Sequence, residues 1–114
     1  GDLMGLSLTG VTLHVADVDK SVEFYKRFPG ASVVFFLSGR FALLKIGSAR
    51  LGILADQKRP FHVEIDCDDL DATHAKFTEL GIPTEGPPTV RPWGERDFWV
   101  IDPDGNLVEV GQAR

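Results

Sequence analysis

An internal repeat restricts the possible folds of this chain more than any other feature of its sequence. Val15–Ser21 and Cys67–Thr73 each pass from an apolar strand pattern through Asp-x-Asp into apolar residues at helical spacing. Asp17 and Asp69 stand where the N-cap of a helix requires a side-chain oxygen. The repeat therefore predicts two helices, each entered from a strand, near Asp19–Phe28 and Leu70–Leu80.

Three strand-like stretches separated by turn residues follow each predicted helix. They are residues 32–37, 41–46 and 50–55 in the first half and 84–91, 98–101 and 107–110 in the second. Pro87 and Pro88 predict that the stretch 84–91 is an irregular edge strand. Each half reads β-α-β-β-β, so we expect an α+β fold with a mixed sheet. The chain is predicted to be a single domain, 1–114, of two βαβββ modules at about 8–56 and 60–112.

Composition and charge exclude several classes of partner. A net charge of -5 leaves no excess of Lys and Arg to neutralise nucleic-acid phosphates or an anionic membrane. No apolar run reaches the roughly 18 residues that span a bilayer. The single cysteine, Cys67, cannot form an internal disulfide and alternates with apolar neighbours, which predicts a buried, unreactive thiol. We therefore expect a cytoplasmic protein that binds neither nucleic acid nor membrane.

Alternation along the strands separates their two faces, because successive side chains point to opposite sides. One face of the first strand carries Gly10, Thr12 and His14, and one face of the fifth carries His62, Glu64 and Asp66. Large apolar residues occur on both faces of the later strands, where Trp99 and Ile101 alternate with Phe98 and Val100. This pattern favours a second face that is covered or that binds a ligand, instead of one that is only solvated.

The repeated Asp-initiated helix, the Phe24-Tyr25 pair and the run Asp102-Pro103-Asp104-Gly105-Asn106-x-x-Glu109 resemble the vicinal oxygen chelate superfamily. That superfamily includes glyoxalase I, extradiol dioxygenases, fosfomycin-resistance enzymes and metal-free bleomycin-resistance proteins. The resemblance covers nearly the whole chain. It implies two βαβββ modules that form a cup around a small molecule, often in a homodimer.

The resemblance also implies where metal ligands would stand. A His seven residues before each helix-entry Asp falls at His62 in the second half, but at Gly10 in the first. The Glu that closes the terminal motif is Glu109, whereas the corresponding place on the fourth strand falls near Gly52. His14 lies about 13 Å along the strand from Gly10, so we expect a rim or hydrogen-bonded His there. Two candidate metal ligands, His62 and Glu109, fall short of the usual three.

Other residues complete the predicted ligand site. Glu64 shares the face of His62 but is expected to lie too far along the strand to assist it. Trp93 and Trp99, with Phe41 and Leu43 on the third strand, could form an aromatic wall for a planar ligand. Arg50 could meet an anionic group. The pair His62 and Glu109 fits a structural hydrogen bond, a ligand clamp or an acid–base pair. The remaining candidates are Thr12 and His14 as polar contacts.

These observations favour a glyoxalase/bleomycin-resistance-type protein that binds a planar or amphipathic small molecule without a metal, as a homodimer. On this interpretation no cofactor is expected, and Gly10 and Gly52 leave open room where ligands would otherwise stand. The alternative is a divalent-metal-dependent lyase or dioxygenase that uses His62, Glu109 and a third ligand. A degenerate module that serves only in dimerisation or regulation is a further possibility. Whether a reaction is catalysed stays open at this point.

Overall fold

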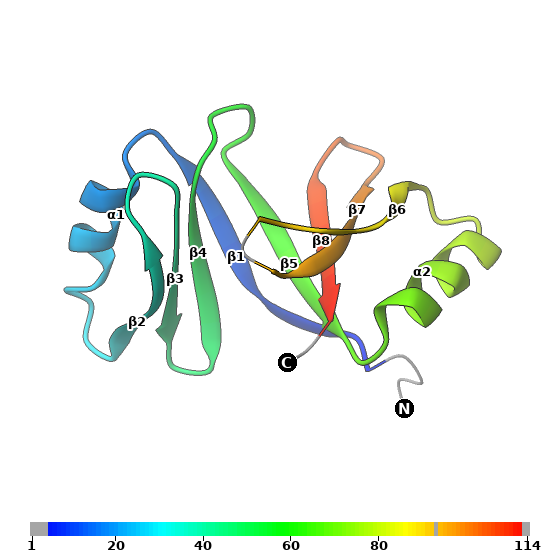
Figure 1. Ribbon diagram of the computed structural model, residues 1–114, viewed down its shortest axis with the longest axis horizontal. Coiled ribbons are helices and arrows are strands. Elements are labelled where there is room, and N and C mark those ends of the chain that lie inside the picture. Colours follow the sequence, from blue (N-terminus) through cyan, green and yellow to red (C-terminus); the bar gives the residue numbers. More distant parts are fainter. Residues whose placement is uncertain (1–4, 93, 113–114) are drawn as a thin grey trace. The chain divides into compact units, whose positions relative to one another are not determined.

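The computed structural model describes residues 5–92 and 94–112. The chain forms two compact units. The N-terminal unit is Thr9–His62, and the C-terminal unit is Val63–Arg114 together with Gly1–Leu8. The described residues contain two helices and eight strands, so each unit has the predicted strand–helix–three-strand order and the α+β class is confirmed (Figure 1). Neither helix in this part of the chain is long and apolar enough to cross a membrane.

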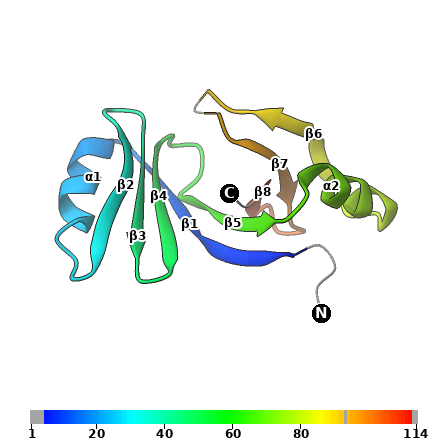
Figure 2. The same cartoon turned by 60° about the horizontal axis from the view of Figure 1, so that its bottom comes forward.

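In the N-terminal unit, helix α1 packs against the two middle strands of four (Figure 2). The elements are β1 (Ser7–Val15), α1 (Val18–Tyr25), β2 (Ala31–Leu37), β3 (Phe41–Ile46) and β4 (Ala49–Ala55). Their order in the sheet is β2-β3-β4-β1, with β1 parallel to β4 and the other pairs antiparallel. The buried core between helix and strands consists of Val18, Val22, Ala42, Leu44 and Ile53.

The C-terminal unit repeats this arrangement with different residues. Its elements are β5 (Phe61–Cys67), α2 (Leu70–Glu79), β6 (Thr84–Val90), β7 (Arg96–Ile101) and β8 (Leu107–Gln112). The order is β5-β8-β7-β6, with β5 parallel to β8. Strand β6 pairs with β7 and shifts register between Glu85 and Thr89, so the irregular edge strand is confirmed. The core is Cys67, Leu70, Phe98 and Val110, and burial raises the pKa of the Cys67 thiol.

Both predicted N-caps are present. The carboxylates of Asp17 and Asp69 accept hydrogen bonds from backbone N–H groups three residues later. Helix α2 ends as expected, because Gly81 at φ 75° allows the N–H of Ile82 to reach the carbonyl of Phe77.

Helix α1 is shorter than predicted. It ends at Tyr25 and not at Phe28, because Arg27 and Phe28 donate to carbonyls three residues back in tighter turns.

Candidate metal and ligand site

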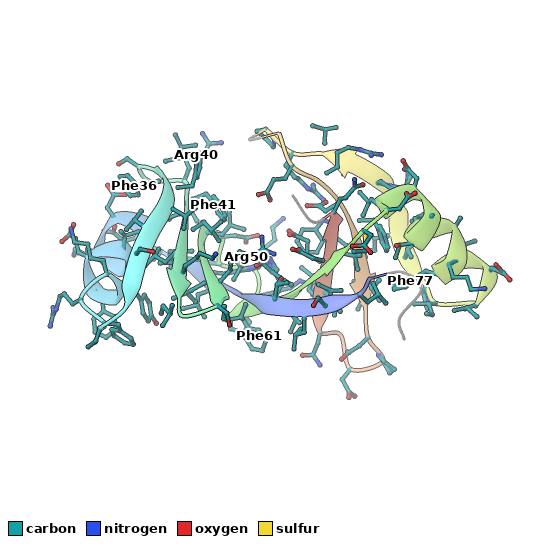
Figure 3. The ribbon with its side chains drawn as sticks, turned by 90° about the horizontal axis from the view of Figure 1, so that it is seen from below. Phe36, Arg40, Phe41, Arg50, Phe61 and Phe77 are labelled. Atoms are coloured by element: carbon teal, nitrogen blue, oxygen red, sulfur yellow. The ribbon has the colours of Figure 1, made fainter. Side chains whose placement is uncertain are left out.

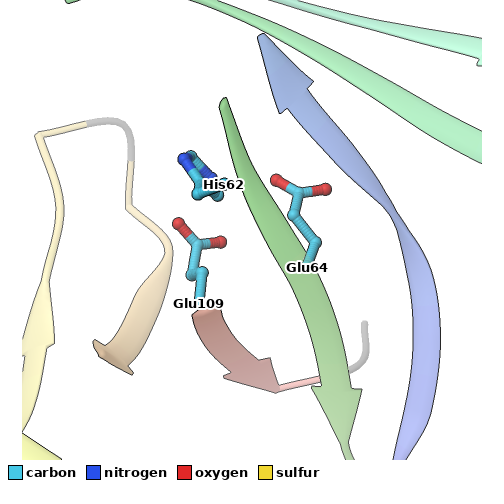
Figure 4. Close-up of side chains that lie close together, drawn as sticks. All are labelled: His62, Glu64 and Glu109. Atoms are coloured by element: carbon cyan, nitrogen blue, oxygen red, sulfur yellow. The ribbon is translucent and has the colours of Figure 1, made fainter. Parts of the chain in front are cut away.

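Three side chains with metal-binding atoms converge on strands β5 and β8. His62 and Glu64 lie on β5, and Glu109 lies on β8, which is hydrogen-bonded to β5 (Figure 4). One ring nitrogen of His62 and one carboxylate oxygen from each glutamate all lie within 4.8 Å of one another. His62 and Glu109 therefore share one place in the structure, as the sequence predicted.

The expectation that Glu64 lies too far away was wrong. Strand register gives the reason, because Glu64 stands directly opposite Glu109 on the paired strand. Directly opposed residues bring their Cβ atoms to about 4.5–5.5 Å, so the two carboxylates meet across the strands and not along one strand. The partner strand of β5 could not be predicted from the sequence, so only the spacing along β5 itself could be used.

The site carries an excess of negative charge. Burial and, after it, the nearby carboxylates of Asp97, Glu64 and Glu95 together raise the pKa of Glu109 to about 9, although Arg91 opposes the change. A divalent cation would relieve this repulsion. One imidazole nitrogen and two carboxylate oxygens also make a common donor set for a first-row divalent ion with open positions. The residues present therefore fit a metal.

A cation and an aromatic ring flank Glu109 on its other side. Trp99 on β7 stands opposite Glu109, and the guanidinium of Arg91 lies over the Trp99 ring at 5.3 Å from its centroid. The Nε of Arg91 donates to both carboxylate oxygens of Asp97, at 2.8 and 3.0 Å, and Asp97 is 1% exposed. This pairing raises the pKa of Arg91. Asp97 and Arg91 were not predicted as site residues. The only sequence signal for Asp97 was its position two residues before Trp99, which places both side chains on the same face of β7.

His14 and His62 form a direct hydrogen bond. The Nε2 of His14 lies 2.7 Å from the Nδ1 of His62, with the rings edge to face. Burial lowers the pKa of His14, and His62 lowers it further. Of the two roles predicted for His14, the structure therefore shows the hydrogen-bonded His. Its partner is one of the three residues that could hold a metal.

The N-terminal unit has no carboxylate at the equivalent strand positions. Thr12 on β1 and Leu43 on β3 both stand opposite Gly52 on β4, and Arg50 stands opposite Gly10. Thr12 is fully buried. Thr12, Leu43 and Arg50 therefore lie on one face of this unit, and their contact with a ligand stays a prediction.

Gly10 and Gly52 do not leave open room, contrary to expectation. A Cβ atom at Gly10 would overlap the carbonyl of Arg50, and one at Gly52 would overlap the side chain of Thr12. The close approach of β1 and β4 is the physical reason. A metal-binding side chain at either position requires the strands to move.

The last two residues to consider are Trp93 and His74. Trp93 lies outside the described residues, so its predicted role stays a prediction. His74 on α2 is half-buried. Its Nε2 lies 3.2 Å from the Thr84 hydroxyl and 3.0 Å from the Gly86 carbonyl, and its ring meets Phe98 edge to face.

The family model of the glyoxalase/bleomycin resistance protein/dioxygenase superfamily matches residues 7–110 of the chain. The chain belongs to this superfamily. The resemblance seen in the repeat and in the terminal motif is thus confirmed, and so is the fold that it implied.

Individual relatives of the superfamily cover most of the chain. The uncharacterised protein YraH of Bacillus subtilis (strain 168) is 27% identical over 92% of this chain and 97% of its own. A superfamily member from Vibrio splendidus 12B01 has a TM-score of 0.72 at 16% identity, covering 95% of this chain and 99% of that one. Methylmalonyl-CoA epimerase from Mycobacterium tuberculosis has a TM-score of 0.77 at 22% identity, covering 94% and 87%. At these identities the solved structures show the shared fold alone.

Proposed function

We propose that this protein binds a small molecule beside a divalent cation held by His62, Glu64 and Glu109. The observation that supports the proposal is the group itself, one nitrogen and two oxygen donors within 4.8 Å of one another. Three protein ligands are the usual number where a metal keeps a position open for water or substrate. The sequence predicted only two ligands, which favoured a metal-free protein. Glu64 raises the number of candidate ligands to three.

The surroundings of the group suit an oxygen-bearing ligand. A divalent cation bound there would polarise a carbonyl or similar oxygen of the ligand. Trp99, opposite Glu109, offers an aromatic face for the apolar part of such a ligand. Arg91 keeps a positive charge over that ring while it is paired with Asp97. The chain's own residues would therefore orient a partly planar, oxygen-bearing molecule.

A metal-free binding protein is the second candidate. It is favoured by Gly10 and Gly52, which leave the ligand positions of the N-terminal unit without side chains or space for them. A Glu109 pKa of about 9 also fits, because a carboxyl group that is neutral near pH 7 can donate a hydrogen bond to a ligand. Under this hypothesis His62 and Glu109 contact the ligand directly.

A titration with Co²⁺, followed by the visible absorption of the bound ion, separates the two candidates. The first predicts saturable binding by the wild-type protein, and His62→Ala should abolish it because one of three ligands is lost. His74→Ala serves as the matched control, since this imidazole contacts Thr84 and Gly86 and lies outside the group. Absence of saturable binding by the wild-type protein would leave the metal-free candidate standing.

We further propose that the protein is a homodimer that associates through strand β2. Val33, Val34, Phe35, Phe36 and Leu37 are each between 42% and 54% exposed, so both faces of the strand are apolar and accessible. We call these five residues the β2 patch. It presents on the order of 400 Å² of apolar surface, the size of patches that usually serve binding.

A second copy is the occupant that the β2 patch fits best. Among the described strands β2 pairs only with β3, at the outer edge of the unit where Phe36 lies (Figure 3). No charged residue occurs between Arg27 and Arg40, so neither an acidic nor a basic partner is attracted. Pairing of β2 with its own copy about a two-fold axis extends the sheet, and exposed Phe24 and Phe28 on the α1 side add apolar area.

Sedimentation equilibrium of Phe36→Lys tests this surface. The wild-type protein should be dimeric and Phe36→Lys monomeric, because a buried lysine without a partner is costly at an interface. Leu80→Lys is the matched control, since Leu80 is 61% exposed at the end of α2 and should leave the dimer intact. A monomeric wild-type protein, or a Phe36→Lys protein that stays dimeric, contradicts the proposal.

A further inference from the structure

We infer that His14 is a positioning residue that sets which ring nitrogen of His62 is available to a metal. The inference rests on the proposed metal group and goes beyond it, because His14 is not among the three ligands. It starts from one contact, the 2.7 Å separation between the Nε2 of His14 and the Nδ1 of His62.

The contact fixes the proton positions of both rings when a metal binds. Two ring nitrogens at this distance share a single proton, so one donates and the other accepts. Because Nδ1 of His62 is engaged with His14, its Nε2 is the nitrogen left for a metal, and a ligating nitrogen carries no proton. The His62 proton must then reside on Nδ1 and be donated to the Nε2 of His14. His14 accordingly carries its own proton on Nδ1.

Backbone contacts hold the accepting ring in place. The N–H of His14 donates to the carbonyl of Pro60 at 2.9 Å, two residues before His62. This bond connects β1 to the residue that precedes β5. It therefore limits how far the backbones of His14 and His62 can move relative to each other. Metal-binding histidines commonly donate their second ring N–H to an acceptor that orients the ring, and here the acceptor is another imidazole.

A purely structural role explains the arrangement poorly. The Nδ1 of His14 is buried and has no hydrogen-bond partner among the described residues. Burying a polar atom without a partner disfavours the folded state. An apolar ring at position 14 would avoid burying this nitrogen, but it would also remove the partner of the buried Nδ1 of His62, so the metal affinity and not the stability is the property that reports the role of His14.

The first test reads the tautomer of His62 in metal-free protein by ¹⁵N NMR of the labelled imidazoles. A positioning role requires His14 to hold the metal-binding tautomer before the metal arrives, so wild-type His62 should show a protonated Nδ1 and an unprotonated Nε2. In His14→Phe, which keeps a ring but has no acceptor, the signals should move to a mixture of tautomers. A wild-type His62 protonated on Nε2, or an unchanged spectrum in His14→Phe, overturns the inference. This measurement does not depend on metal binding.

The second test measures Co²⁺ affinity and the visible spectrum of bound Co²⁺ in the same variants. His14→Phe should lose roughly 10–100-fold in affinity and show an altered spectrum, as expected when the partner of a ligating His is removed. His14→Gln, which restores an acceptor oxygen, should recover most of that loss. His74→Phe is the matched control and should bind as the wild-type protein does.

Thermal unfolding of the metal-free variants completes the design. His14→Phe loses the hydrogen bond to His62 and should unfold at a somewhat lower temperature, but well above that of the binding assay, so that its weaker metal binding is not a consequence of unfolding. If the wild-type protein binds Co²⁺ and His14→Phe binds it equally well, the positioning role fails while the metal site stands. If the wild-type protein binds no Co²⁺, the proposed metal site fails and the role of His14 fails with it.

Discussion

The two units carry chemically different side chains at equivalent strand positions. Across β1, β4 and β3 the N-terminal unit places Thr12, Gly52 and Leu43 side by side. Across β5, β8 and β7 the C-terminal unit places Glu64, Glu109 and Trp99 at the equivalent points. One row is neutral, and the other carries two carboxylates and a large aromatic ring. A repeated backbone therefore does not imply a repeated site.

The difference extends from side chains to the spacing of the strands. In the N-terminal unit a Cβ at Gly10 or Gly52 would overlap a neighbouring residue, because β1 and β4 approach closely there. The equivalent positions on β5 and β8 hold His62 and Glu109 with their side chains directed into the metal group. The close approach of β1 and β4 is thus consistent with the absence of metal-binding side chains at Gly10 and Gly52.

The largest expected effect concerns Asp97, whose equivalent in the N-terminal unit is Phe41. Both are buried, but only Asp97 requires a partner, which is Arg91. Arg91→Met should lower the free energy of unfolding by about 3 kcal/mol, because a buried carboxylate loses its counter-ion. Urea denaturation measures this change.

The matched variant Arg96→Met removes an exposed pair with Asp71 and should cost about 0.5 kcal/mol or less. Equal losses in the two variants would show that the Arg91–Asp97 pair is not structural.

The next largest effect concerns the close approach of β1 and β4 in the N-terminal unit. Gly10→Ala should lower the free energy of unfolding by about 2 kcal/mol, because its Cβ meets backbone that cannot move aside alone. Gly111→Ala on β8 is the control, since its Cβ would lie 3.7 Å from the nearest atom, the Arg96 carbonyl oxygen. Thermal or urea unfolding that leaves the two variants equally stable contradicts the asymmetry.

A smaller effect concerns Glu64, the ligand that the sequence interpretation had set aside. Glu64→Gln should weaken Co²⁺ binding about tenfold, or about 1.4 kcal/mol, because an amide oxygen replaces a charged donor. Asp66→Asn, one position further along the same face of β5, is the control and should bind nearly as well as the wild-type protein. Identical affinities for Glu64→Gln and Asp66→Asn would reduce the metal group to His62 and Glu109.

The sequence predicted the elements of the fold because its signals were local. The aspartates at 17 and 69 and the prolines of β6 each act on their own backbone, and the structure confirms the caps and the irregular strand that they predicted. Contacts across strands were harder to predict, since they depend on which strand pairs with which. The opposition of Glu64 to Glu109, the bond between His14 and His62, and the lack of space at Gly10 all arise from such pairing.

The strand pair β5–β8 is proposed to hold a divalent cation, and the equivalent pair β1–β4 to hold none. The most direct measurement is elemental analysis of protein saturated with Co²⁺ and freed of unbound metal by gel filtration. About one cation per chain is expected in the wild-type protein and none in Glu109→Ala, because one of the three ligands is removed. A wild-type protein with well under one cation per chain, or a Glu109→Ala protein that keeps its full content, would contradict this expectation.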